Sequence, residues 1–147
     1  MDYPLNDQPV TIERTLNAPA ARVWKAITDS EQMKQWYFDI ADFQPEVGFE
    51  FHFLAGPAQK QYLHVCKVTE VESGKKLTYS WRYDGYEGMS YVTFELVEEG
   101  KHTRLRLTHR GLETLPRNNP DFARDNFAEG WTYIIDTALK GFVEKDL

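Results

Sequence analysis

The stretch DNFAEGWTYIIDTALKGF, residues 125–142, decides the fold because it predicts one long amphipathic helix near the end of the chain. At 100° per residue one helical face collects the apolar and small side chains Ala123, Phe127, Gly130, Trp131, Ile134, Ile135, Ala138, Gly141 and Phe142. A glycine weakens a helix interior by about 0.5–1 kcal/mol relative to alanine. Since Gly130 and Gly141 share one edge of this face, we predict that they mark where a sheet comes nearest or where a pocket opens.

The middle of the chain predicts an antiparallel sheet with one solvent-facing side. Apolar and polar residues alternate over six stretches, which are 10–16, 48–54, 61–71, 77–83, 90–97 and 103–110. The connections from residue 72 to residue 101 are short, and Asp84-Gly85 is a strong hairpin signal. The sheet must bury its apolar side, and the long helix is the only predicted element large enough to cover it.

Two short helices are expected between the first and second strands. Pro19 suits the first turn of one helix, and Ser30 can cap a second that carries Met33 and Trp36. We therefore predict an α+β helix-grip fold, in which a curved antiparallel sheet of about six to seven strands wraps around the long C-terminal helix. Residues 1–147 are expected to form one domain, with residues 1–9 as a loosely ordered tail.

Composition narrows the function classes. The 147 residues carry a formal net charge of −6, which argues against a general nucleic-acid binder because phosphate contacts need clustered Lys and Arg. No window approaches the roughly 20 apolar residues of a membrane span, so no membrane insertion is expected. A single cysteine, Cys66, and an N-terminus unlike a signal peptide indicate a cytoplasmic protein.

Five stretches carry a resemblance to a known family. They are RTLNAPAARVWKAITDSEQMKQWY (14–37), VGFEFHF (47–53), VTEVESGKKLTYSW (68–81), TRLRLTH (103–109) and GWTYIIDTALKGF (130–142). Together they resemble the START-like, or SRPBCC, superfamily, which includes birch-pollen-allergen-like proteins. The resemblance is greatest to the domain named for activators of the heat-shock-protein-90 ATPase. It implies a deep pocket between sheet and long helix, often used for small apolar ligands, and it implies no single reaction.

Aromatic residues on predicted inward faces, or at the rim between sheet and helix, are the candidate ligand-binding residues. They are Trp36, Phe51, Phe53, Tyr62, Trp81, Tyr83, Phe127 and Trp131, together with His64, which faces the same way as Tyr62. Each ring taken alone is more typical of a packed core than of a pocket. As a group they favour a pocket, because the polar atoms of buried Tyr and Trp need partners that a ligand supplies.

The remaining polar residues give weaker signals. His64 and Cys66 offer only two donors on one strand, so we expect neither a metal site nor a cysteine nucleophile, and no cofactor or catalytic residue is predicted. Arg14 and His109 interrupt otherwise apolar strand faces. Arg14 could anchor a ligand carboxylate, or bond a core acid or main-chain carbonyl groups, and we favour the structural role.

Three functions remain open. The first is a binding protein for a small hydrophobic or amphipathic molecule. The second is a module that regulates a chaperone partner, implied only by the resemblance. The third is a cyclase- or hydratase-like enzyme in which His64, Tyr62 or Arg14 performs acid–base work. A monomer or weak homodimer is expected in each case.

Overall fold

A computed structural model describes residues 8–57 and 59–145, so residues 1–7 of the expected tail lie outside the described part of the chain. Its centre is a six-stranded antiparallel sheet in the order β1-β6-β5-β4-β3-β2. The strands are β1 (Val10–Leu16), β2 (Glu50–Ala55), β3 (Tyr62–Glu72), β4 (Lys76–Tyr83), β5 (Ser90–Glu99) and β6 (His102–Arg110). Each lies within two residues of the stretch that alternation predicts, because one wet and one buried face leave a clear period of two.

Two short helices follow β1, as predicted: α1 (Ala20–Thr28) and α2 (Ser30–Trp36). The cap of α2 is Asp29 and not Ser30, since the Asp29 carboxylate accepts a hydrogen bond from the main-chain N–H of Gln32 at 3.2 Å. The two helices are therefore joined by one extended residue, which turns the chain between them.

The long C-terminal helix covers 20 residues in three continuous parts: α3 (Arg124–Tyr133), the π-helical η4 (Ile134–Leu139) and α4 (Lys140–Val143). Two short 3-10 turns precede it, η2 (Leu112–Thr114) and η3 (Pro120–Phe122). Asn119 caps η3 by accepting a hydrogen bond from the Asp121 N–H, and extended Ala123 separates this turn from the helix. Because of this separate turn and the extended residue after it, the long helix begins at Arg124, four residues after Pro120.

The π segment changes which face of the helix is buried. The buried residues of the helix recur at every fourth position: Phe127, Trp131, Ile135, Leu139 and Val143. A π turn holds more residues than an α turn, so a wheel drawn at 100° per residue misplaces the C-terminal half. Gly141 is exposed, and a Cβ built at Gly130 or Gly141 meets no atom within 4 Å. The predicted close approach of the sheet is therefore wrong at both glycines.

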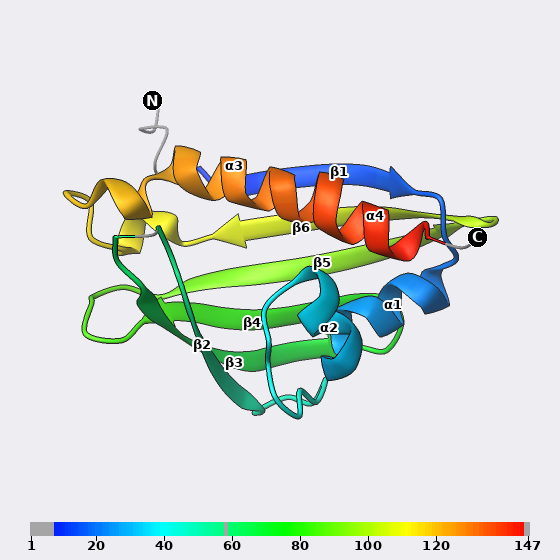
Figure 1. Cartoon of the computed structure of the whole chain (residues 1–147), viewed down its shortest axis with the longest axis horizontal. Helices are drawn as coiled ribbons and strands as arrows, with labels where there is room; N and C mark the ends of the chain where they lie inside the picture. Colours follow the sequence, from blue (N-terminus) through cyan, green and yellow to red (C-terminus); the bar gives the residue numbers. More distant parts are fainter. Residues whose placement is uncertain (1–7, 58, 146–147) are drawn as a thin grey trace.

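The sheet and the long helix form two layers (Figure 1). The helix runs along the β1–β6 side of the sheet and contacts β1, while α1 contacts β5 and β6. The core lies between these layers and includes fully buried Leu105, Leu107, Ile135 and Leu139. This is the helix-grip arrangement. No helix in the described ranges is long and apolar enough to cross a membrane.

Candidate functional site

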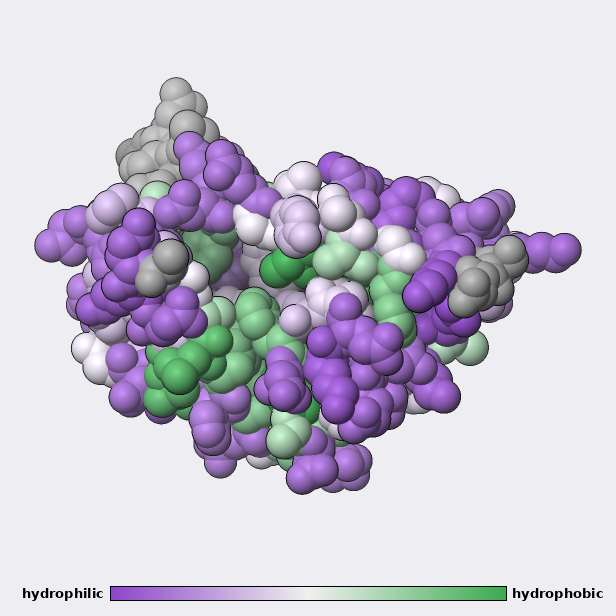
Figure 2. Space-filling model, in the orientation of Figure 1, coloured by the Kyte–Doolittle hydropathy of each residue, from purple (hydrophilic) through white to green (hydrophobic). Residues whose placement is uncertain are grey.

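A cavity of about 230 Å³ lies between the first half of the long helix and strands β3 and β4. Figure 2 shows a hollow beneath this helix, with apolar surface inside it and along its lower edge and polar surface above it and to its left. The lining residues come from the β2–β3 loop, β3, β4, η3 and the helix: Gly56, His64, Trp81, Tyr83, Asp121, Asn126, Phe127, Gly130, Trp131 and Ile134.

Five of the nine candidate ligand-binding residues line this cavity: His64, Trp81, Tyr83, Phe127 and Trp131. They converge because β3 and β4 are neighbours in register, with His64 opposite Tyr83. Phe127 and Trp131 are one helical turn apart on the buried face above them. Alternation and helical spacing were therefore sufficient to place these side chains on facing surfaces.

The other four candidates are buried but do not line the cavity. The Trp36 indole N–H donates to the Ala26 carbonyl oxygen at 2.9 Å, which ties α2 to α1. Phe51 and Phe53 stack on one another with ring centroids 6.4 Å apart. Tyr62 lies at the rim, where its hydroxyl is held by Asp121.

The prediction missed lining residues that come from turns or from the helix start. Asp121 lies in the 3-10 turn before the helix and Asn126 in the first helical turn, positions that sequence periodicity does not place. Gly56 directly follows β2 in the β2–β3 loop with φ +152°, and a Cβ there would lie 2.5 Å from the Lys60 carbonyl oxygen. A residue with a side chain would thus displace this loop. Gly130 lines the cavity, in agreement with the pocket alternative proposed for it from sequence.

His64 is a neutral, largely buried ring at one wall of the cavity. It stacks on Phe53 of β2 with centroids 4.5 Å apart and meets Tyr83 of β4 edge-on at 4.6 Å. Its Nδ1 lies 3.0 Å from the Tyr62 carbonyl oxygen. Burial lowers the pKa of His64 to about 4, although main-chain groups of Tyr62 and Phe53 favour the charged form. The ring is therefore uncharged at neutral pH.

Tyr83 places a hydroxyl in the same wall. The Trp81 indole N–H donates to the Tyr83 hydroxyl oxygen at 2.9 Å. Within residues 8–57 and 59–145, no group accepts the hydroxyl's own proton. Burial raises the pKa of Tyr83 well above its ordinary value, so the hydroxyl keeps this proton. Tyr83 thus retains one unused hydrogen-bond donor beside the cavity.

The rim of the cavity carries a polar cluster. The Tyr62 hydroxyl donates to Asp121 Oδ2 at 2.6 Å and accepts from Asn119 Nδ2 at 3.3 Å. The bond to the Asp121 carboxylate raises the pKa of Tyr62. Lys60 Nζ lies over the rings of Tyr62 and Tyr86, 5.5 and 5.7 Å from their centroids. This cluster ties the β2–β3 loop and η3 together at the cavity entrance.

His109, the second polar exception in the sequence, belongs to a closed network beside the cavity. The Trp131 indole N–H donates to His109 Nδ1 at 2.9 Å, so the ring proton lies on Nε2 and is donated to Ser90 Oγ at 2.8 Å. Ser90 in turn donates to the Trp81 carbonyl oxygen at 2.8 Å. Complete burial, reinforced by His64, lowers the pKa of His109 to about 3. The network fixes the long helix to β6, β5 and β4.

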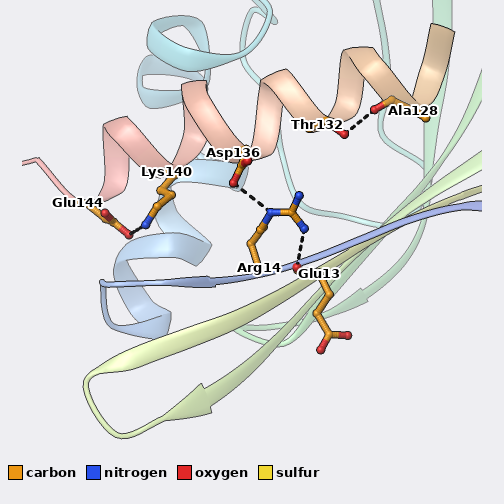
Figure 3. A network of polar contacts seen from close by, with 7 residues as sticks. All are labelled: Glu13, Arg14, Ala128, Thr132, Asp136, Lys140 and Glu144. Carbon is orange, nitrogen blue, oxygen red and sulfur yellow. Dashed lines mark hydrogen bonds and ion pairs between the residues drawn. The ribbon is translucent and has the colours of Figure 1, made fainter. Parts of the chain in front are cut away.

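Arg14 takes the structural role expected for it, but its side chain is 40% exposed. Figure 3 shows it between β1 and the π segment, where its Nε donates to Asp136 Oδ1 at 3.0 Å. Its Nη1 donates to the Glu13 carbonyl oxygen at 2.9 Å. Nearby, Lys140 pairs with Glu144 along the helix (Figure 3). Arg14 is absent from the lining of the cavity.

The residues considered for catalysis therefore do not converge. His64 lines the cavity, the Tyr62 hydroxyl is bound to Asp121 at the rim, and Arg14 is ion-paired elsewhere. Cys66 is 1% exposed, and burial raises the pKa of its thiol far above the ordinary value. No group of three or more His, Cys, Asp or Glu in the described part of the chain could hold a metal ion.

Comparison with known proteins agrees with this geometry. The family model described as "Activator of Hsp90 ATPase homolog 1-like protein" matches residues 17–144, which include the helices, strands β2 to β6 and the whole cavity lining. The chain belongs to this family. Its superfamily is the START-like, or SRPBCC, one, whose members are typically proteins with a hydrophobic cavity. No curated protein matches the chain.

Solved structures with the same fold include several bacterial proteins. Protein MLL2253 from Mesorhizobium loti is 27% identical, with a TM-score of 0.75 over 95% of this chain and 100% of its own. Protein BH1534 from Bacillus halodurans is 26% identical, with a TM-score of 0.71 over 92% and 96%. CalU16 from Micromonospora echinospora is 25% identical, with a TM-score of 0.72 over 95% of this chain and 76% of its own.

Proposed function

We propose that the chain binds a small, largely apolar molecule in the cavity between the long helix and strands β3 and β4. The observation that carries this proposal is the lining itself. Trp81, Phe127, Trp131 and Ile134 supply large apolar surfaces, and only a few polar groups interrupt them. Ligand sites are commonly concave, mostly apolar and equipped with a few polar groups of this kind.

The size of the cavity limits the ligand. Drug-sized molecules occupy pockets of roughly 300–1,000 Å³, and an apolar cavity of about 150 Å³ holds benzene. A volume of about 230 Å³ therefore suits one or two rings, or one end of a longer molecule that extends through the opening. Trp81 and Trp131 line the space, so occupation will alter tryptophan emission.

Two helical glycines provide a matched test. Gly130 lines the cavity and Gly141 does not, while a Cβ at either position meets no atom within 4 Å. Gly130→Leu should therefore fill the cavity mouth, whereas Gly141→Leu should add the same side chain to open surface. Naphthalene serves as the probe, with quenching of tryptophan fluorescence and the rise in Tm as readouts.

We expect wild type and Gly141→Leu to bind naphthalene equally and Gly130→Leu to bind it at least tenfold more weakly, about 1.4 kcal/mol. Equal binding by all three proteins would place the ligand elsewhere. No binding by wild type would overturn the proposal.

The family description supports one alternative, a chaperone-regulating module that acts on an Hsp90-type ATPase. Its test is the ATPase rate of a purified Hsp90 homologue with and without this protein. A rate that rises in proportion to complex formation supports the alternative. An unchanged rate at saturating protein removes it and leaves ligand binding unaffected.

A further inference from the structure

The unused donor of Tyr83 gives the cavity a chemical preference. Tyr83 is 4% exposed, and its hydroxyl oxygen already accepts from the Trp81 indole N–H. In the described part of the chain nothing accepts the proton of that hydroxyl. A buried donor without an acceptor is unfavourable, and an occupant with an acceptor atom would satisfy it.

Charge in the lining disfavours an anionic occupant. Asp121 is a carboxylate in the lining, and the ten residues that line the cavity include neither Lys nor Arg. His64 carries no charge at neutral pH, because burial lowers its pKa to about 4. The nearby cation, Lys60, is held at the rim over the rings of Tyr62 and Tyr86. An anion placed among these groups would lose hydration without gaining a counter-ion.

We infer that the ligand presents a neutral oxygen acceptor, such as a ketone or aldehyde oxygen, to the Tyr83 hydroxyl, and that carboxylates are rejected. This inference rests on the proposed binding function and names the chemical class of its ligand. The rings of Trp81 and Trp131 hold the apolar part of the molecule, while Tyr83 orients its oxygen.

Three probes with one ring system separate these contributions: naphthalene, 2-acetylnaphthalene and 2-naphthoate. For wild type we expect 2-acetylnaphthalene to bind about 3- to 10-fold more tightly than naphthalene, the range of one net hydrogen bond. 2-Naphthoate should bind at least tenfold more weakly than the ketone. Calorimetry or tryptophan fluorescence at pH 7 measures all three.

Two tyrosine variants locate the donor. Tyr83→Phe should bind naphthalene and 2-acetylnaphthalene within twofold of each other, because the donor is gone. Tyr79→Phe is the matched control and should keep the preference for the ketone, since Tyr79 is a buried tyrosine of the same strand that does not line the cavity and whose hydroxyl pairs with the Tyr37 hydroxyl at 2.6 Å. Tyr83→Phe leaves the Trp81 indole N–H without its acceptor. If this variant does not fold, the affinities of the wild-type protein for the three probes still decide the question.

The outcomes separate this inference from the proposed function. Equal wild-type affinity for naphthalene and the ketone overturns the Tyr83 assignment and leaves ligand binding intact. Tightest binding of 2-naphthoate overturns the rejection of carboxylates. If no probe binds, the proposed function fails and the inference fails with it.

Discussion

His109 and His64 both turn toward the buried side of the sheet, on β6 and β3, yet their surroundings differ. His109 is fully buried, and both ring nitrogens bond protein groups, Trp131 on the helix and Ser90 on β5. His64 borders a cavity of about 230 Å³. Trp81 lies between them, and its ring centroid is 5.3 Å from that of His109 and 4.9 Å from that of His64.

This difference indicates how one layer interface combines stability with a binding site. Around His109 the polar groups are satisfied inside the protein, so the network holds the helix on the sheet. Around His64 and Tyr83 the helix does not fill the space, and one donor remains for an occupant. We therefore expect substitutions near His109 to change mainly stability and those near His64 to change mainly binding.

The largest effect should come from His109→Ala. The substitution removes a buried ring and leaves the Trp131 indole N–H without an acceptor, which should cost roughly 3–4 kcal/mol of unfolding free energy. His64→Ala should cost roughly 1 kcal/mol, because its ring already borders empty space. Urea unfolding measures both. Equal losses would remove the distinction between the two regions.

Acid should weaken the fold through the same histidines. Their pKa values are about 3 for His109 and about 4 for His64, below the ordinary 6.5, so the unfolded chain binds protons first. The contribution of these neutral histidines to the unfolding free energy is therefore fully present above pH 6.5, and it is lost as the pH drops toward 3. Between pH 7 and pH 4, His109 alone should account for on the order of 3 kcal/mol.

The check is urea unfolding at several pH values, with His109→Ala compared with wild type. The variant should lose markedly less stability over this range. A His109 ring that titrates near pH 6.5 in the folded protein would contradict this explanation.

The two helical glycines should behave alike in stability, although they differ in binding. Each sits in open space on the helix, so Gly130→Ala and Gly141→Ala should each raise unfolding free energy by about 0.5–1 kcal/mol. Thermal unfolding measures both variants. A destabilised Gly130→Ala would mean that the sheet does approach the helix at that position.

The smallest effect on stability should come from removing the exposed ion pair between Arg14 of β1 and Asp136 of the long helix. Arg14 and Asp136 are 40% and 43% exposed, and such ion pairs contribute about 0–1 kcal/mol. Arg14→Gln should therefore cost less than about 1 kcal/mol, and less still at high salt. A loss as large as that of His109→Ala would show that the surface pair, rather than the buried network, holds the helix.

Much of the fold could be predicted from the sequence because its signals are local. Alternation in stretches such as 90–97 and 103–110 reflects one wet and one buried sheet face. The phase of the long helix could not be predicted throughout, because Ile134–Leu139 is π-helical. An α-helical wheel therefore placed Gly141 on the buried face, whereas Leu139 and Val143 occupy it.

The cavity was only partly predictable for a related reason. Periodicity indicates which face a side chain occupies, and this was sufficient for His64, Trp81 and Tyr83. It does not indicate where along the strand the helix leaves space, so Phe51 and Phe53 were equally good candidates although they pack in the core. The hydrogen-bond network of His109 likewise depends on contacts between elements that are distant in the sequence. From the sequence, His109 could be recognised only as a polar residue on an otherwise apolar strand face, and its partners could not be predicted.

Indole N–H signals in a ¹H–¹⁵N spectrum test the central claim most directly. Trp81 and Trp131 line the cavity, while Trp36 donates to Ala26 and Trp24 packs outside the cavity lining. On titration with naphthalene, the Trp81 and Trp131 signals should shift together and saturate, and those of Trp36 and Trp24 should stay in place. Shifts at Trp24 or Trp36 with unchanged Trp81 and Trp131 would contradict a ligand site between the long helix and the sheet.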